Sequence, residues 1–188
     1  MVKEHIFKIC VVGASRVGKT SIITRYIDDT FHSDTKITIG TNLFITRVKL
    51  PDNDADITLQ IWDIGGNQKF DNIRPVFYSG ARGIIYTYDL TRSDSLIDLL
   101  RWKKEIDTYI GSKPSLLVGN KLDLIKEKKQ ERLSEFNINK IKENLDALNY
   151  LETSAKTDKN IDLIFQKMAM FIYNYNRITN NYSSIHQF

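Results

Sequence analysis

A loop bounded by glycines near the N-terminus constrains this chain more than any other segment. Residues 13–20 read GASRVGKT and fit the pattern G-x-x-x-x-G-K-[ST]. The residues before it, 6–12, are apolar and β-branched like a buried strand, and residues 18–28 have helical apolar spacing. Such a loop wraps a polyphosphate with backbone N–H groups, and the helix N-terminus adds its dipole. The sequence therefore predicts a nucleoside triphosphate site here.

The residues of this loop are expected to have separate roles. Gly18 permits the backbone to approach the phosphates closely, Lys19 supplies a positive charge to the outer phosphates, and the Thr20 hydroxyl binds Mg²⁺. The backbone amides around them complete the predicted phosphate site, which adds Ser15, Arg16, Val17 and Ser21. The alternative is a glycine turn followed by a chance lysine. It does not account for the strand and the helix on either side.

A second motif predicts which base is bound. Residues 120–123 read NKLD and follow a short apolar run, residues 115–119. The Asp123 carboxylate would accept hydrogen bonds from N1–H and from the 2-amino group of guanine. Adenine offers no such pair of donors on that edge, and a buried acceptor without a partner costs about 1–3 kcal/mol. Asn120 is expected to connect this loop to the phosphate loop, and the Lys121 side chain to lie over the base.

Two weaker motifs also follow predicted strands. In ETSAK, residues 152–156, the backbone N–H of Ala155 would meet guanine O6, while Ser154 and Lys156 would shape and cover the loop. In WDIGG, residues 62–66, Asp63 suits a water-mediated contact with Mg²⁺. The N–H of Gly66 would sense the terminal phosphate.

Runs with strand character alternate with runs of helical spacing, which favours an α/β fold in three layers with a mostly parallel sheet. Strands are predicted at residues 6–12, 38–50, 56–63, 83–89, 115–119 and 150–153, and helices at 18–28, from 93 or 94 to 109 or 110, 137–148 and 161–175. The hairpin formed by 38–50 and 56–63 would add one antiparallel edge strand. We expect one domain over residues 1–175 and a loose polar tail over residues 176–188.

Composition narrows the class of protein. The net charge is only +4 and the basic residues are not interleaved with aromatic ones, so no nucleic-acid partner is expected. The single cysteine, Cys10, suits a core position in a reducing compartment. No secretory signal, membrane span or lipid-attachment motif is visible. The expectation is a monomeric, cytoplasmic protein with no covalent lipid anchor visible in this sequence, although a longer natural chain with a lipidated tail stays open. Peripheral recruitment to a membrane would then depend on partners.

Taken together, these motifs resemble those of Ras superfamily small GTPases, and most closely the Rab branch. The stretches LQIWDIGGNQKF, YSGARGIIYTYDLT, LLVGNKLDL and LETSAK carry the resemblance. It implies a P-loop G domain with six strands and five helices, a GTP/GDP cycle, and effector, exchange-factor and GTPase-activating partners. It also implies that Thr38 binds Mg²⁺ and the γ-phosphate in the triphosphate state, and that Phe31 packs against the guanine edge, although Phe31 would equally suit a core position.

The chain departs from this family at one catalytic position. The family pattern Asp-x-Ala-Gly-Gln is replaced by Asp63 followed by Ile-Gly-Gly-Asn, so Asn67 stands where a glutamine orients the attacking water. The double glycine resembles the Arf branch. Asparagine is one methylene shorter, so we expect slow hydrolysis unless Gln68 substitutes from a shifted loop. The predicted catalytic residues are Asn67, Gly66, Thr38 and Lys19.

Two other functions stay open at this stage. A GTP-loaded scaffold with negligible turnover would also explain Asn67. An ATP-using P-loop enzyme would explain the phosphate loop, but residues 120–123 argue against it. Arg16 and Arg74 are expected on the solvated surface, so an arginine that assists catalysis would come from a partner.

Overall fold

The structure is a computed structural model that describes residues 4–32, 38–50, 55–67, 72–128 and 134–185. Its described residues contain six strands and seven helical segments. In chain order these are β1 Glu4–Val12, α1 Lys19–Asp28, β2 Thr41–Lys49, β3 Asp56–Ile64, α2 Arg74–Tyr78, β4 Gly83–Asp89, α3 Ser93–Ile97, α4 Leu99–Ile110, β5 Ser115–Asn120, α5 Leu122–Lys128, α6 Glu135–Asn144, β6 Asn149–Glu152 and α7 Ile161–Ile185.

The six strands form one mixed sheet in the order β2-β3-β1-β4-β5-β6. Strand β1 pairs in parallel with both β3 and β4, and the parallel pairing continues to β5 and β6. Only β2 is antiparallel, and it pairs with β3 from Thr41 opposite Ile64 to Lys49 opposite Asp56. The predicted α/β fold with one antiparallel edge strand is therefore confirmed.

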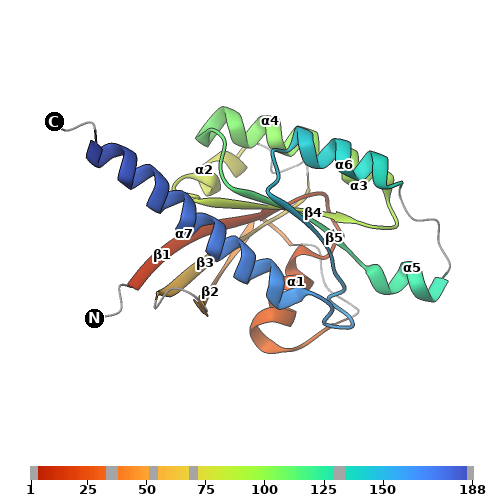
Figure 1. The fold of residues 1–188 in the computed structure, drawn as a ribbon. Helices are drawn as coiled ribbons and strands as arrows, with labels where there is room; N and C mark the ends of the chain where they lie inside the picture. Colours follow the sequence, from red (N-terminus) through yellow and green to blue (C-terminus); the bar gives the residue numbers. More distant parts are fainter. Residues whose placement is uncertain (1–3, 33–37, 51–54, 68–71, 129–133, 186–188) are drawn as a thin grey trace.

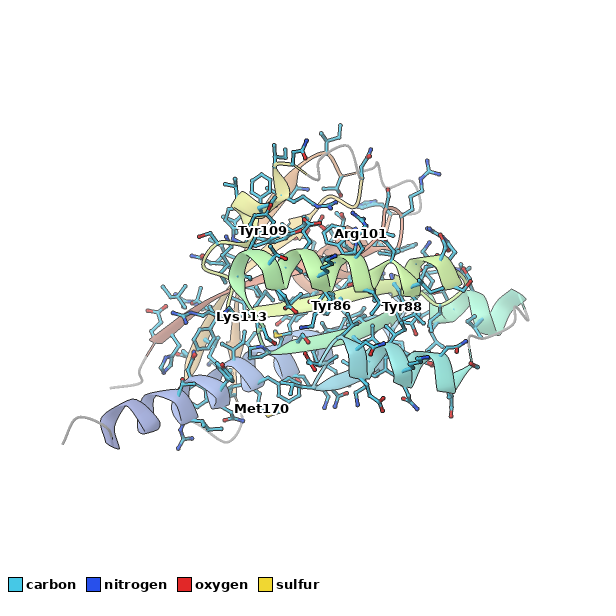
Figure 2. The ribbon with its side chains drawn as sticks, turned by 90° about the horizontal axis from the view of Figure 1, so that it is seen from above. Tyr86, Tyr88, Arg101, Tyr109, Lys113 and Met170 are labelled. Atoms are coloured by element: carbon cyan, nitrogen blue, oxygen red, sulfur yellow. The ribbon has the colours of Figure 1, made fainter. Side chains whose placement is uncertain are left out.

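Helices cover both faces of this sheet (Figure 1). Helices α1 and α7 pack on one face, where Ile22 and Phe165 join the buried side chains of β1 and β3. Helices α2, α4 and α6 pack on the other face. Seen from above, α4 runs alongside β4, whose Tyr86 and Tyr88 belong to the same core cluster as Trp102 (Figure 2). Because both faces are covered, β4 and β5 are buried along their whole length.

Two details differ from the expectation. The described residues hold seven helical segments rather than five, because α3 and α4 are separated only at Asp98 and because α5 follows directly after Lys121. Helix α7 also continues to Ile185, ten residues beyond its predicted end, so most of the expected loose tail is helical. Residues 176–185 are polar but contain no proline or glycine that would end a helix. Within the described part of the chain, no helix has the length and apolar character needed to span a lipid bilayer.

Arg74 is buried, and its expected position on the solvated surface is wrong. Only 1% of the residue is exposed. Its Nε and Nη2 donate to the two carboxylate oxygens of Glu105 at 3.1 and 2.7 Å, and its guanidinium lies 4.1 Å from the centre of the Trp102 ring. The Tyr78 hydroxyl donates to the same carboxylate at 2.8 Å. Arg74 begins helix α2, which faces α4, so the charge is paired across these two helices.

Candidate nucleotide-binding site

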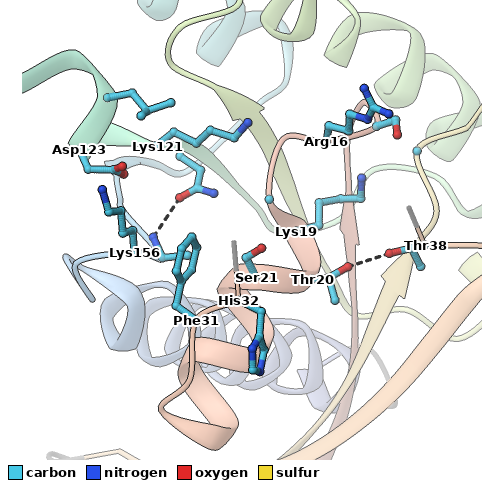
Figure 3. A pocket seen from close by; sticks show the side chains of 16 residues that line it. Arg16, Lys19, Thr20, Ser21, Phe31, His32, Thr38, Lys121, Asp123 and Lys156 are labelled. Carbon is cyan, nitrogen blue, oxygen red and sulfur yellow. Dashed lines mark hydrogen bonds between the residues drawn. The ribbon is translucent and has the colours of Figure 1, made fainter. Parts of the chain in front are cut away.

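The carboxyl ends of β1, β3, β5 and β6 open into one cavity, as expected for ligand sites in parallel α/β sheets. The cavity has a volume of about 470 Å³. Figure 3 shows the side chains around it. It is lined by Ser15, Arg16, Gly18, Lys19, Thr20, Ser21, Phe31, His32, Thr38, Gly66, Asn120, Lys121, Asp123, Leu124, Ala155 and Lys156. We call the part around residues 120–124 and 153–156 the base end, and the part around residues 13–21, 38–40 and 63–67 the phosphate end.

The phosphate loop needs glycine at both of its ends. Gly13 and Gly18 have φ angles of 138° and 95°, which side chains rarely adopt. A Cβ on Gly13 would lie 2.0 Å from the Thr87 carbonyl oxygen, and one on Gly18 would lie 2.2 Å from Asn120 Nδ2. The Lys19 ammonium reaches back over the loop and donates to the carbonyl oxygens of Gly13 and Ala14 at 2.8 and 2.9 Å. The loop is thus closed around a lysine charge.

Two buried charges of opposite sign lie at the phosphate end. Burial lowers the pKa of Lys19 to about 8, an effect that the Asp63 carboxylate partly offsets. Burial likewise raises the pKa of Asp63, opposed by the Thr20 hydroxyl and the Lys19 charge. Each charged form is disfavoured by desolvation. A bound phosphate next to Lys19 and a cation next to Asp63 would restore both, which fits a metal–phosphate ligand.

The predicted metal-binding residues converge from three segments of the chain. Thr20 Oγ1 lies 2.5 Å from Asp63 Oδ2 and 2.7 Å from Thr38 Oγ1, and Thr38 Oγ1 lies 3.5 Å from the same Asp63 oxygen. Asp63 Oδ1 is buried and has no hydrogen-bond partner among the described residues. Hydroxyl and carboxylate oxygens are the ligands that Mg²⁺ prefers, often with water between. The described residues contain no group of three or more His, Cys, Asp or Glu that would bind a metal another way.

The double glycine after Asp63 has a steric reason. The Gly65 N–H donates to the Gly40 carbonyl oxygen at 2.8 Å. A Cβ on Gly65 would lie 2.8 Å from that oxygen and 2.9 Å from the Thr38 carbonyl oxygen, and a Cβ on Gly66 would lie 2.4 Å from Ser15 N. The chain here passes between the Thr38 segment and the phosphate loop, where neither position has room for a side chain.

Asn120 holds three loops together at the base end. Its Nδ2 donates to the Val17 carbonyl oxygen of the phosphate loop at 3.0 Å. Its Oδ1 accepts from Thr153 Oγ1 and from the Ala155 N–H, each at 3.3 Å. The residue is only 2% exposed. The predicted connection between the base loop and the phosphate loop is therefore present, and the Ala155 N–H points to this amide in the structure (Figure 3).

The other base-end side chains are also held in place. Ser154 Oγ donates to Asp123 Oδ1 at 2.6 Å, which leaves the second carboxylate oxygen for a ligand. Lys121 Nζ lies 2.8 Å from the buried Asp89 carboxylate, so its side chain extends along the loop. The Asp123 carboxylate faces the cavity together with Lys121 and Lys156, and the ring of Phe31 lies nearby (Figure 3).

Most of the predicted site residues line this cavity, and the exceptions lie directly behind or beside it. Val17 and Ser154 are buried and contribute through the contacts just described. Asp63 is buried behind Thr20. Asn67 lines a neighbouring hollow instead, and Gln68 lies outside the described residues. The sequence motifs do not include His32 or Leu124, which line the cavity, or Arg92, which lines the neighbouring hollow.

Arg92 could have been predicted from its position in the sheet topology. It follows the end of β4, the strand next to β1 in the sheet. Residues just beyond the carboxyl ends of neighbouring strands meet at the ligand site of such sheets. No residue motif marks Arg92, so only the topology brings it to the phosphate loop.

Several known proteins are similar to this chain in sequence. A model of the Ras family matches residues 8–174. The Ras-related protein Rab-12 of Mus musculus is 37% identical over 163 residues, which cover 86% of this chain and 65% of the mouse protein. The GTP-binding protein YPT1 of Saccharomyces cerevisiae is 37% identical over 167 residues, 88% of this chain and 78% of the yeast protein. The match thus spans slightly less than two thirds of Rab-12.

Proposed function

Because the chain belongs to the Ras family and its relatives place it in the Rab branch, we propose that it is a switch protein that binds GTP and GDP with Mg²⁺ and hydrolyses GTP. One observation supports this most directly. A single cavity joins a phosphate loop to a base loop through Asn120, whose side chain contacts both the Val17 carbonyl and the 153–155 segment. ATP-using enzymes share the phosphate loop but have no need for the second half of this arrangement.

Guanine would be selected at the base end. Asp123, held by Ser154, presents a carboxylate oxygen to the N1–H and the 2-amino group. Adenine would leave this acceptor without donors, at a cost of about 1–3 kcal/mol or more for a charged group. The Lys121 side chain and the Phe31 ring would cover the base, and Ala155 and Lys156 would close its edge.

The phosphates would lie against residues 15–21, with Lys19 exchanging its contacts to the loop carbonyls for phosphate oxygens. Thr20, Thr38 and Asp63 would hold Mg²⁺, which neutralises phosphate charge when bound. Thr38 and Gly66 belong to segments in contact with each other through Gly65 and Gly40. Loss of the γ-phosphate would remove the ligand that both segments share, which is the general basis of order–disorder switches.

Hydrolysis would use positioning rather than covalent chemistry. The oxygen of a water molecule bonds to the γ-phosphorus, the bond to the bridging oxygen breaks, and its electron pair leaves with GDP while the water proton passes to the released phosphate. The Gly66 N–H would stabilise the terminal phosphate and Asn67 would orient the water. Since the Asn67 amide is one methylene shorter than glutamine, we expect the intrinsic rate to be low.

Partners would complete the cycle. Family membership supports effector proteins, an exchange factor and a GTPase-activating protein as the interacting classes. We expect the chain to act as a monomer in the cytoplasm and to reach membranes peripherally through these partners. A GTP-bound scaffold with negligible hydrolysis is the second candidate, and Asn67 is the observation that favours it.

Single-turnover phosphate release tests both candidates. The protein is loaded with GTP, Mg²⁺ is added, and phosphate is followed for the natural chain and for Asn67→Gln. We expect a slow natural rate that rises about tenfold in the variant, because the longer amide reaches the water. The affinity for GDP serves as the control and should be unchanged. A rate in Asn67→Gln that is level or lower would show that Asn67 does not limit the reaction, and no measurable release from either protein would favour the scaffold.

A further inference from the structure

A second, open hollow of about 690 Å³ lies beside the phosphate end of the nucleotide cavity. It is lined by Ser15, Arg16, Asn67, Arg92 and Lys121. Three of these residues, Ser15, Arg16 and Lys121, also line the nucleotide cavity, so the two spaces adjoin along the phosphate loop. The hollow therefore brings together the residue at the water-orienting position, Asn67, and an arginine from a different part of the chain.

Arg92 contacts the phosphate loop directly. Its Nη1 donates to the Ser15 carbonyl oxygen at 3.2 Å, across 77 positions of sequence. Its Nη2 donates to the Asp94 carboxylate at 2.8 Å. The two side chains of this ion pair are 38% and 72% exposed. Exposed ion pairs contribute only about 0–1 kcal/mol, so the guanidinium can leave Asp94 for a stronger anion at little cost.

The other positively charged side chains of this region have different contacts or positions. Lys121 lies 2.8 Å from the buried Asp89 carboxylate. Arg74 is buried against Glu105 and Trp102. Arg16 is part of the phosphate loop itself, where its backbone has a positive φ of 65°. Among these four residues, Arg92 combines two properties. It contacts the phosphate loop from another part of the chain, and its acidic partner, Asp94, is exposed and weakly held.

We propose that Arg92 is a catalytic residue supplied by the chain itself: its guanidinium moves from Asp94 to the terminal phosphate and stabilises the charge that develops there. This inference rests on the proposed GTP hydrolysis. The bond changes are those given above, with the electron pair of the broken bond leaving on the GDP bridging oxygen. Guanidinium is suited to this role because its planar set of N–H donors contacts two phosphate oxygens at once. It would partly compensate for the short Asn67.

The test measures formation of a transition-state analogue, with no partner protein present. The chain is loaded with fluorescent GDP and Mg²⁺, and aluminium fluoride is titrated in. An arginine acting on the transferred phosphate contributes about 10³–10⁵-fold when fully engaged. Since Arg92 is partly solvated, we expect the natural chain to bind aluminium fluoride and Arg92→Ala to bind it at least about tenfold more weakly. Asp94→Asn, which frees the guanidinium, should bind it more tightly.

Arg101→Ala is the matched control. Arg101 is also a partly exposed arginine with a nearby aspartate, 2.9 Å from Asp98, but it lies on α4 and lines neither hollow (Figure 2). This variant should bind aluminium fluoride like the natural chain. GDP affinity and thermal midpoint are measured for all variants, so that a folding defect in Arg92→Ala is recognised. If Arg92→Ala does not fold, the comparison of Asp94→Asn with the natural chain tests the role of Arg92 by itself.

The outcomes separate this inference from the proposed function. A natural chain that fails to bind GDP contradicts the proposed function itself. If GDP binds but aluminium fluoride does not, or binds equally to the natural chain and to Arg92→Ala, the role of Arg92 is wrong while the GTP-binding function stands. Loss of the signal in Arg16→Ala but not in Arg92→Ala would assign the role to Arg16 and overturn the proposal as well.

Discussion

The base end of the cavity is held by hydrogen bonds among three loops, whereas the phosphate end is held by a few bonds between residues that a ligand would separate. At the base end, Asn120 and Asp123 are 2% and 9% exposed, and both have protein partners that leave room for a base. At the phosphate end, Lys19 donates to loop carbonyls and Thr20 to Asp63, contacts that stand where phosphate and metal would bind.

This difference predicts separate roles for the two ends of the cavity. A base end whose acceptors are already oriented loses little conformational entropy on binding, which favours selectivity and affinity. A phosphate end whose charged groups are poorly solvated, as the lowered pKa of Lys19 and the raised pKa of Asp63 show, changes its contacts when the ligand changes. Only the phosphate end would then report whether GTP or GDP is present.

If helix α2, which follows the phosphate end in the chain, were held as weakly as that end, removing one of its buried contacts would have little effect on stability. Helix α2 begins at Arg74, which is paired with Glu105 and stacked on Trp102. Arg74→Ala leaves the Glu105 carboxylate half-buried without its cation, and we expect the free energy of unfolding to fall by about 3–5 kcal/mol, as when one partner of a buried pair is removed. Denaturant unfolding of the nucleotide-free and GDP-bound protein measures this.

Two variants make that measurement decisive. Arg101→Ala removes a more exposed arginine of the same α2–α4 region and should cost about 1 kcal/mol or less. Replacing Arg74 and Glu105 together by Met and Leu should be much milder than Arg74→Ala, since no charge is then left alone. A small loss in Arg74→Ala would mean that α2 is as loosely held as the contacts around Thr38.

The second prediction concerns the base end. Asp123→Ala removes the acceptor of two guanine donors, and hydrogen bonds to charged groups contribute about 1.5–3 kcal/mol each, so GDP should bind at least about 10²-fold more weakly. Inosine diphosphate, which lacks the 2-amino group, serves as the internal control. The natural chain should prefer GDP to it, and the preference should vanish in the variant. Isothermal titration measures both; a preference that survives in Asp123→Ala would place the base contact elsewhere.

The convergence of the residues of the base end and of the phosphate loop on one cavity could be predicted from the sequence for a physical reason. Their residues are contiguous, as in 13–20 and 120–123, and each run follows a strand that could be recognised by its apolar character. The sheet brings consecutive strand ends together, so local patterns were sufficient to predict the α/β fold, its antiparallel edge and the clustering of the motifs.

What the sequence did not predict depends on distant neighbours. The burial of Arg74 requires Glu105 and Trp102 on α4, and the contact of Arg92 with Ser15 requires β4 to lie beside β1. Neither residue belongs to a contiguous motif. The continuation of α7 to Ile185 was missed because polar, Asn-rich composition suggested a tail, although no residue there ends a helix.

The smallest expected effect should separate the two nucleotide states at the phosphate end. Thr38→Ala removes a hydroxyl that lies 2.7 Å from Thr20 Oγ1. A neutral hydrogen bond contributes about 0.5–1.5 kcal/mol, so we expect a non-hydrolysable GTP analogue to bind roughly fivefold more weakly. GDP, which lacks the γ-phosphate that Thr38 is proposed to contact, should bind equally well. Thr38→Ser keeps the hydroxyl and should restore the analogue. An equal loss of affinity for GDP in Thr38→Ala would mean that Thr38 acts in both states, and the phosphate end would then resemble the base end in being arranged before the γ-phosphate arrives.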